Sequence, residues 1–529
     1  MKKTLPLFLM GMFLLLLDSA RAQQIVFSAP EKEDARNLSF EIIGKIEGNV
    51  LVHKESRDIH HIAVYDMEMN LRDKVKPDYL PERSRILSTD FLTYNNFAYF
   101  FYQYQQKNTV YAMAVKLGSD GKKIGDPVVL DTTSNVNYTV NNKIYTFINS
   151  EDKQKIVAFK ISTRNDKEHV IIAAMFDKAL SPVEKVRVAV GMPEKNDFLG
   201  EFGVSNDGSI VCLRQSGTSQ NDNINKISLL VKPVGSINFT ENQLKVNKIY
   251  LDDTRIKIDN LNKHYLVTSF FSKIRRGNVD GLYYTLWDMA ENKELLNATT
   301  LFTDEYRADV RGDGPLKTAF NDFYLKNLIL RKDGGFMIVA ESAYVTNRGN
   351  TLNRWDYMNG SPFFNPMYGG AYYGSPYNYY SFNNPMGLYP WGGGFNSFGM
   401  MSGRNMGSNV NRYYADNVAI ISFEPGGKME WSNVIRKSQY DDNTDNFIGY
   451  GLVNSGDQIH FLFNIQDKRS NLLTDQSMSP VGQIDRTPTL KNLDRGYDFM
   501  PRHARQVGAR QAIVPCIYRG YTCFAKIDF

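Results

Sequence analysis

Short apolar runs that follow polar turns recur along the whole chain. The turns contain Gly, Asn or Asp, as in "IEGNVLVH", "YNNFAYFFY", "SNDGSIVCL" and "RKDGGFMIVA". The runs are rich in β-branched and aromatic residues, which favour strands, and helical periodicity is nearly absent. This pattern predicts short strands joined by tight turns.

A second unit usually follows the first one. It consists of an apolar strand, a charged or Gly-containing turn and another strand, as in "HIAVYDMEMNLRDKVK", "LYYTLWDMAENKELL" and "VAIISFEPGGKMEWSNVI". Most repeats are spaced by roughly 45 to 70 residues, the scale of one four-stranded propeller blade with its loops. We predict an all-β fold, a single β-propeller of about six to eight blades with seven preferred.

The two ends of this propeller are expected to meet. The early segment "QQIVFSA" can pair with the final strand "YTCFAKIDF" and so close the ring without a free edge. Two stacked β-domains and an outer-membrane β-barrel are the alternatives, and the alternating last strand that ends on Phe529 is typical of such barrels. Continuous apolar runs such as "VIIAAM" favour strands buried on both faces over barrel strands with one polar side.

The first residues have the pattern of an export signal. Lys2 and Lys3 precede an apolar stretch over 5–17 that is too short to span a membrane, and "ARA" at 20–22 fits the small-x-small cleavage pattern. We predict a signal peptide at 1–22, the propeller at 23–529 and a periplasmic location, associated with the outer membrane or, as second choice, secreted. No later stretch is long and apolar enough for a transmembrane helix.

Charge and cysteine content limit the partners and the covalent cross-links. The formal net charge of +5 over 529 residues is near neutral, so nucleic acid is not expected as a partner. Cys516 and Cys523 flank the tight turn "IYRGY" and face each other if this turn is a hairpin. A disulfide between them and two free buried thiols both remain open, and we expect Cys212 to be a small core residue.

The chain lacks the common catalytic and metal-binding motifs. G-x-S-x-G, H-E-x-x-H, C-x-x-C and the phosphate-binding G-x-x-x-x-G-K are absent from the sequence. His60 and His61 are strand neighbours that point to opposite faces, and "DDNTDN" at 441–446 lacks the Gly and Glu of a calcium loop. We therefore expect no catalytic residues, no metal and no cofactor.

A low-complexity aromatic loop at 346–415 interrupts the repeats. Its centre, "GGAYYGSPYNYYSFNNPMGLYPWGGG", carries no charge and is rich in Gly and Pro. Large aromatic faces without charges suit insertion into a groove, a pore or a membrane interface. A loop without a role is the alternative. The predicted partner-binding residues are Tyr372, Tyr373, Tyr377, Tyr379, Tyr380, Tyr389, Trp391, Phe395 and Phe398.

The signal-like start, the "QQ" that follows it and the Asn/Tyr/Lys-rich β composition resemble exported proteins of Bacteroidota. Together with the aromatic loop, the propeller-like repeats resemble the periplasmic accessory, plug-like components of the type IX secretion translocon. This resemblance implies a protein partner in the envelope, an outer-membrane translocon. The main functional prediction is a non-enzymatic envelope scaffold that docks on such a complex through the aromatic loop.

Two other functions stay open besides the scaffold. The first is a propeller hydrolase or lyase, or a glycan-binding protein, that acts at the channel mouth. Such a site would gather carboxylates, for example Asp288, Glu305 or Glu341, but the sequence does not show which of them meet. The second is the outer-membrane β-barrel.

Overall fold

The computed structural model describes residues 24–529, with gaps at 32–37, 57–58, 82–84, 137–142, 165–166, 218–221, 313, 348–349, 352–410, 443–444, 468–469 and 487–495. The predicted signal peptide and the nine predicted partner-binding aromatic residues lie outside the described residues. No helix in the described ranges has the length and apolarity needed to cross a membrane.

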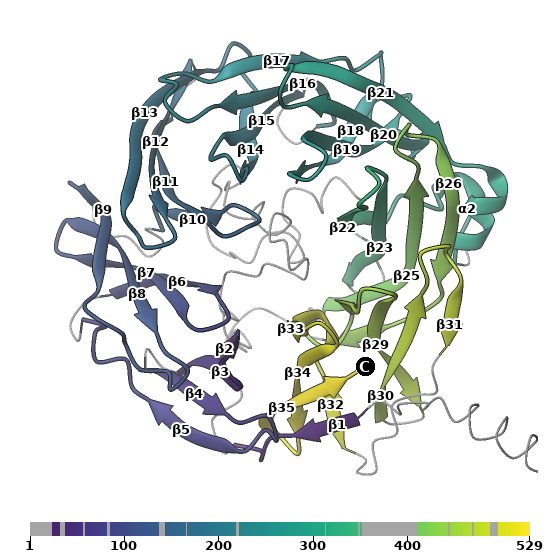
Figure 1. The fold of residues 1–529 in the computed structure, drawn as a ribbon. Coiled ribbons are helices and arrows are strands. Elements are labelled where there is room, and N and C mark those ends of the chain that lie inside the picture. Colours follow the sequence, from purple (N-terminus) through teal and green to yellow (C-terminus); the bar gives the residue numbers. More distant parts are fainter. Residues whose placement is uncertain are drawn as a thin grey trace, which may run out of the picture.

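The described strands form a ring of eight antiparallel blades (Figure 1). Seven sheets are present, and the eight-stranded one divides at the single bridge between Ile224 and Leu251 into two four-stranded blades. The predicted β-propeller is thus confirmed. Its blade number is the upper end of the predicted range, one more than the preferred seven.

Each blade runs from an inner strand at the axis to an outer strand at the rim. The strands of the first four blades are as follows. Blade 1 has β2 (Leu38–Ile46), β3 (Asn49–Ser56), β4 (Ile59–Tyr65) and β5 (Leu71–Val75), and blade 2 has β6 (Arg85–Thr93), β7 (Ala98–Gln106), β8 (Thr109–Leu117) and β9 (Val128–Ser134). Blade 3 has β10 (Thr146–Asn149), β11 (Lys155–Arg164), β12 (Glu168–Asp177) and β13 (Pro182–Gly191), and blade 4 has β14 (Phe198–Val204), β15 (Ile210–Gly217), β16 (Ile224–Lys232) and β17 (Thr240–Leu244).

Blades 5 to 8 complete the ring. Blade 5 has β18 (Tyr250–Asp259), β19 (His264–Ser272), β20 (Gly281–Asp288) and β21 (Lys293–Leu301). Blade 6 has β22 (Phe323–Leu330), β23 (Phe336–Asn347), β25 (Asn411–Phe423) and β26 (Met429–Ile435), with β24 (Asn350–Thr351) and β27 (Tyr440–Asp442) beside them, and blade 7 has β28 (Tyr450–Asn454), β29 (Ile459–Asp467), β30 (Ser470–Met478) and β31 (Ile484–Arg486). Blade 8 has β33 (Arg505–Gly508), β34 (Gln511–Tyr518), β35 (Tyr521–Asp528) and β1 (Gln24–Phe27), with β32 (Tyr497–Phe499) also paired to β34. In the described part of the chain the helices are α2 (Asp304–Val310), η1 (Leu316–Thr318) and η4 (Pro501–His503).

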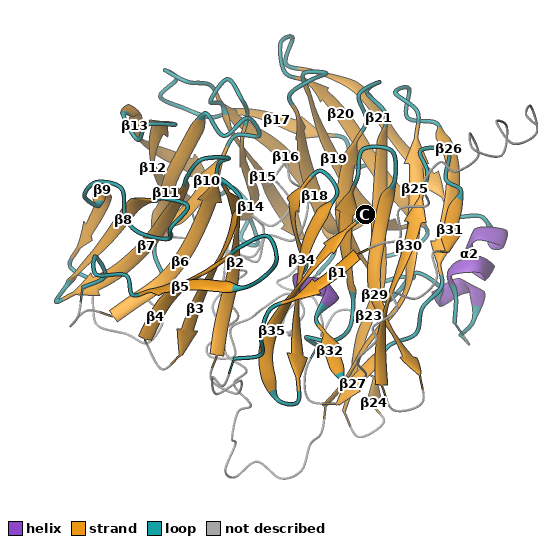
Figure 2. Ribbon diagram, turned by 60° about the horizontal axis from the view of Figure 1, so that its bottom comes forward, coloured by secondary structure: helices purple, strands orange, loops and turns teal. Residues whose placement is uncertain are grey.

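The two repeated sequence units correspond to the two hairpins on one side of each blade. Units such as "SNDGSIVCL" form the turn from the first strand to the second, and units such as "LYYTLWDMAENKELL" form the hairpin of the third and fourth strands. Because the strands alternate in direction, both kinds of turn lie on the same side of the ring. Figure 2 shows the strands of the blades standing side by side around the axis.

The apolar core is divided among the interfaces between neighbouring blades. In β3, Val50 and Val52 pack toward blade 8, whereas Leu51 packs toward blade 2. Strand neighbours point to opposite faces, and here both faces are covered. This arrangement explains why the strands have continuous apolar runs, as the sequence predicted.

The N-terminal strand closes the ring, as predicted. β1 pairs with β35 as the outer strand of blade 8, with Gln24 opposite Asp528 and Phe27 opposite Ala525. In Figure 1 the purple start of the described chain lies beside its yellow end. The backbone pairing continues beyond β1, because the N–H of Ser28 donates to the carbonyl of Phe524 over 2.9 Å.

The loop predicted at 346–415 and a polar, proline-containing stretch at 467–505 both contain strands. The flanks of the predicted loop at 346–415 lie in β23, β24 and β25, so this insertion arises within blade 6. The polar stretch at 467–505 contains β30, β31 and β32. The sequence pattern did not reveal β31 and β32, because each has only three residues near a proline. Each pairs with a single strand, β31 with β30 and β32 with β34.

Candidate functional site at the ring axis

Ionisable side chains from four neighbouring blades gather at the inner wall of the ring. Glu41 lies on β2, Asp90 on β6 and Arg505 at the start of β33, and Lys143 precedes β10. Each of these four side chains interacts electrostatically with at least two of the others. We call them the axial cluster.

Bulges in the inner strands bring blades 1 and 2 together at this wall. The pairing of β2 with β3 shifts between Ile42 and Gly44, and the pairing of β6 with β7 shifts between Ile86 and Ser88. Such bulges turn side chains toward new directions. Gly44 has a φ of 137°, and a Cβ there would lie 3.0 Å from Cγ2 of Thr93. The absence of a side chain at this position therefore lets β6 approach β2.

Glu41 is the most buried member of the axial cluster, with 9% of its surface exposed. Its Oε2 atom is buried and has no hydrogen-bond partner in the described part of the chain. Nη1 of Arg505 lies 3.7 Å from its Oε1 atom but donates its hydrogen bond, over 2.6 Å, to the carbonyl of Ile42. The side chain of Arg505 is 27% exposed, so solvent reaches this wall.

The two carboxyl groups of the cluster hold protons more strongly than usual. Burial, together with the charge of Asp90, raises the pKa of Glu41 to about 8 against the pull of Arg505 and Lys143. Burial also raises the pKa of Asp90, although Lys143 and the N–H of Phe91 act in the opposite direction. Like charges close together cannot both ionise readily. The pair therefore retains a proton near neutral pH.

The cationic members respond to the same environment in the opposite sense. Burial lowers the pKa values of Lys143 and Arg505, and the carboxyl groups partly restore them. At the nearby turn from β10 to β11, burial and then the charge of Arg505 lower the pKa of Lys153 to about 8. The axial cluster thus places two cationic side chains beside two carboxyl groups, and burial disfavours the charged form of each.

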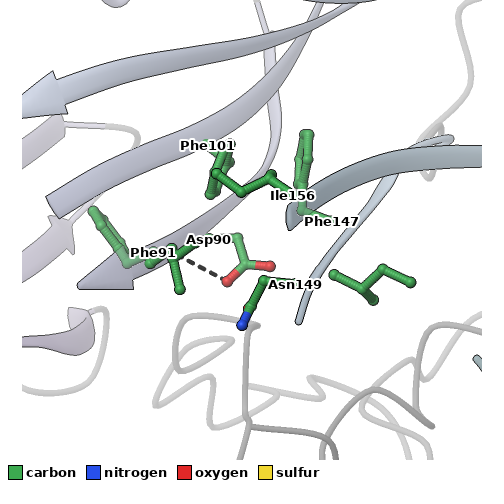
Figure 3. A pocket seen from close by; sticks show the side chains of 8 residues that line it. Asp90, Phe91, Phe101, Phe147, Asn149 and Ile156 are labelled. Carbon is green, nitrogen blue, oxygen red and sulfur yellow. Dashed lines mark hydrogen bonds between the residues drawn. The ribbon is translucent and has the colours of Figure 1, made fainter. Parts of the chain in front are cut away.

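Asp90 also borders a small cavity of about 20 Å³ between blades 2 and 3. Figure 3 shows Asp90 and Asn149 at one side of it and the rings of Phe101 and Phe147 at the other. One Asp90 oxygen, Oδ1, accepts the N–H of Phe91 over 2.8 Å. The cavity has room for about one water molecule, which needs polar partners such as the Asp90 and Asn149 side chains.

Two other buried carboxylates, Glu201 on β14 and Glu341 on β23, have direct partners. Oε2 of Glu201 accepts the N–H of Ile256 over 3.0 Å, and its Oε1 lies 3.5 Å from Arg255. Glu341, one of the carboxylates singled out from the sequence, lies 2.9 Å from Lys437, and although burial opposes it, this lysine keeps the pKa of Glu341 below its usual value. Glu201 thus joins blades 4 and 5, whereas Glu341 is paired within blade 6.

The other two carboxylates named from the sequence lie away from the axis. Asp288 accepts the backbone N–H groups of Ala290 and Glu291 in the turn after β20, and Glu305 is exposed in the first turn of α2. Neither of these two side chains belongs to the axial cluster. The sequence thus suggested carboxylates at the axis but not the correct ones.

A Ser–His–Asp chain in blade 7 has hydrogen-bond distances typical of a catalytic triad. Nδ1 of His460 lies 2.8 Å from Oδ2 of Asp475, and its Nε2 lies 3.2 Å from Oγ of Ser455. However, Ser455 also donates within its own turn to Asp457, over 2.9 Å. Ser150 and Ser205 donate to Asp152 and Asp207 in the same way in blades 3 and 4, where no histidine takes part. Ser455 therefore belongs to a repeated structural turn.

Two segments that the sequence analysis weighed as metal-binding candidates can be located in the structure. His60 is buried and its Nδ1 lies 3.1 Å from Nε2 of His53 on β3, whereas His61 points to the other face. In the segment at 441–446, which lacks the Gly and Glu of a calcium loop, Asp445 forms an ion pair with Arg502. Within the described ranges no group of three His, Cys, Asp or Glu side chains is arranged to hold a metal ion.

No known family model matches this chain, and no curated protein matches it. Among solved structures, it is similar to prolyl oligopeptidase B from Galerina marginata, with 11% identity and a TM-score of 0.38, over 94% of this chain and 56% of that one. It is also similar to the dihydro-heme d1 dehydrogenase NirN, with 10% identity and a TM-score of 0.33, over 93% of this chain and 73% of that one. The chain thus spans little more than half the length of the oligopeptidase.

The main functional prediction, a non-enzymatic scaffold, is contradicted by these comparisons, because the oligopeptidase and NirN are enzymes. TM-scores below 0.4 assign no activity, so the reaction has to be inferred from the side chains of this chain.

Proposed function

We propose that this protein is a propeller hydrolase that cleaves glycosidic bonds of an anionic glycan at the ring axis. The observation that carries this proposal is the Glu41–Asp90 pair. Two carboxyl groups on adjacent inner strands influence each other's ionisation, and one of them is protonated near neutral pH. A protonated and an ionised carboxyl group are the acid and base of glycoside hydrolysis.

The two carboxyl groups differ in environment, and this difference assigns their roles. Glu41, with a pKa raised to about 8, donates its proton to the leaving glycosidic oxygen. Asp90 borders the cavity that has room for one water molecule, and it removes a proton from that water as the water attacks the anomeric carbon. The bond between the anomeric carbon and the glycosidic oxygen breaks. The proton from Glu41 stays on the leaving oxygen, and the proton from the water stays on Asp90.

The cations of the axial cluster suggest the substrate class. Lys143 and Arg505 place two cationic side chains beside Glu41, whose carboxyl group holds its proton near neutral pH. Such a site favours a sugar that bears a carboxylate, sulfate or phosphate group. Neutral glycans lack a group that would compensate these partly buried cations.

The experiment measures reducing ends released from a polyuronate, a sulfated glycan and a neutral glucan. We expect the wild-type protein to cleave an anionic polymer, and Asp90→Asn and Glu41→Gln each to reduce kcat by about 10²- to 10⁴-fold. Glu305→Gln, which changes an exposed carboxylate on α2, is the matched control and should retain full activity.

Cleavage that persists in Asp90→Asn would contradict the assignment. A wild-type protein that binds an anionic glycan without cleaving it would instead support the glycan-binding alternative. Thermal melting of each variant separates loss of chemistry from loss of fold.

We also propose that the chain acts outside the cytoplasm, on the strength of the signal-like residues 1–22. Fractionation of cells that express the full chain tests this location, and a cytoplasmic protein of unchanged mass would contradict it. The resemblance to type IX translocon components, and the partner expected from it, stay predictions.

A further inference from the structure

Two cysteines face each other in the hairpin that closes the ring. Cys516 on β34 and Cys523 on β35 are direct cross-strand partners, and their Sγ atoms lie 3.0 Å apart. Both side chains are fully buried, between blades 7 and 8. Cys212, the third cysteine of the chain, lies in blade 4 on β15.

The turn geometry fixes this pairing. Arg519 and Gly520 have φ values of 50° and 84°, which are typical of the two-residue turn that matches the twist of a hairpin. Counting outward from the closing pair Tyr518–Tyr521 places the two cysteines at a hydrogen-bonded position. The Cα atoms of such a pair are about 5.5 Å apart, within the range that a disulfide spans.

The same hairpin holds the N-terminal strand. The N–H of Phe524 donates to Oγ of Ser28 over 3.0 Å, and the N–H of Ser28 donates to the Phe524 carbonyl over 2.9 Å. Any covalent link across β34 and β35 therefore reinforces the sheet on which closure of the ring depends.

We infer that Cys516 and Cys523 form a disulfide that locks the closing hairpin when the chain folds in an oxidising compartment. The Sγ–Sγ bond forms by thiol–disulfide exchange with a disulfide oxidant, either a dithiol oxidoreductase or oxidised glutathione. The two cysteines lose two electrons and two protons, and the oxidant disulfide is reduced to two thiols.

The burial of the pair determines when this oxidation takes place. Burial raises the pKa of the Cys516 thiol well above its usual value, so little reactive thiolate is present in the folded ring. Exchange is therefore fast while the hairpin is still exposed and slow once blade 8 is packed. The oxidised bond is protected from reductants for the same reason.

The test refolds the full chain in a buffer of oxidised and reduced glutathione. We expect one titratable thiol in denaturant instead of three, a mass lower by about 2 Da, and a peptide that links residues 516 and 523. The folded reduced protein should oxidise at least about tenfold more slowly than the refolding chain. The oxidised protein should melt at a higher temperature than the reduced protein.

The matched control is Cys212→Ala, which should still lose two thiols on refolding. The double variant Cys516→Ala, Cys523→Ala should keep its single thiol and show no redox-dependent change in melting temperature. Three free thiols in the refolded wild-type chain, or a linked peptide that contains Cys212, would overturn the inference. Neither result depends on the glycan activity, so the two proposals can fail separately.

Discussion

At the interface of blades 8 and 1, the carboxylate of Glu31 lies between two lysines, whereas the carboxyl group of Glu41 on the adjoining β2 faces Asp90. Lys54 and Lys74 approach Glu31 to 2.5 Å and 2.6 Å. Although burial opposes it, these lysines lower the pKa of Glu31 to about 2, while burial and Asp90 raise that of Glu41 to about 8. The same kind of side chain is thus ionised in one place and protonated near neutral pH in the other.

The Glu31 arrangement recurs between other blades. Lys160 on β11 reaches Asp131 on β9 of the preceding blade over 2.6 Å, and Lys232 on β16 reaches Glu184 on β13 over 2.8 Å. In each case a buried lysine of one blade meets an acid on the outer strand of the blade before it. The axial cluster departs from this rule, because its two cations do not bring the pKa of either carboxyl group back to its usual value.

The largest effect is expected when a buried lysine that pairs with an acid of the preceding blade is removed. Lys54→Met leaves the largely buried Glu31 with the Tyr65 hydroxyl and the partly exposed Lys74, and should cost about 3 to 5 kcal/mol of the free energy of unfolding. Urea denaturation at pH 7 measures this cost. Lys74→Met removes the other partner, which is 35% exposed, and as a matched control should cost about 1 kcal/mol or less.

The next effect is a stability difference between wild type and Glu41→Gln that changes between pH 4.5 and pH 8. Because the pKa of Glu41 is higher in the folded chain than in the unfolded one, the contribution of the protonated group is present below about pH 4.5 and is lost as the pH rises through 8. Relative to Glu41→Gln, the wild-type protein should lose on the order of 4 kcal/mol between pH 4.5 and pH 8. Parallel stability curves for the two proteins would contradict a protonated Glu41.

A third effect has the opposite pH dependence and tests Glu31. Its pKa is lower in the folded chain, so its contribution is present above about pH 4.5 and is lost as the pH falls to about 2. The wild-type protein should lose about 3 kcal/mol more than Glu31→Gln over this window. Chemical denaturation from pH 5 to pH 2 checks it, and an identical decline in both proteins would show that Glu31 is not ion-paired.

The smallest effect concerns the polar turns, where a structural Ser–Asp hydrogen bond resembles part of a catalytic Ser–His–Asp arrangement. Ser455→Ala and Ser205→Ala each remove one hydroxyl from the same kind of turn and should each cost about 1 kcal/mol. Glycan cleavage should be unchanged in both variants. Loss of activity in Ser455→Ala alone would instead assign a catalytic role to the His460–Asp475 chain.

Much of the fold could be predicted from the sequence. Apolar runs such as "VIIAAM" identified strands covered on both faces, the polar turns marked the hairpins, and "QQIVFSA" identified the strand that closes the ring. The short strands β31 and β32 were missed because three residues beside prolines carry no periodic signal. The candidate site was missed for a different reason, since "FEII" and "STDFL", which contain Glu41 and Asp90, look like ordinary strand segments.

The sequence by itself determined the local structure of this protein, because turn chemistry and the apolar run of each strand act between near neighbours. It also determined that the ring could close. Only the tertiary structure decided the number of blades and which acids meet a lysine, because these depend on the angle between packed sheets and on bulges that move a side chain from one interface to the axis. The pKa of Glu41 follows from that placement, as burial and a like charge from another blade act on it only once the ring is assembled.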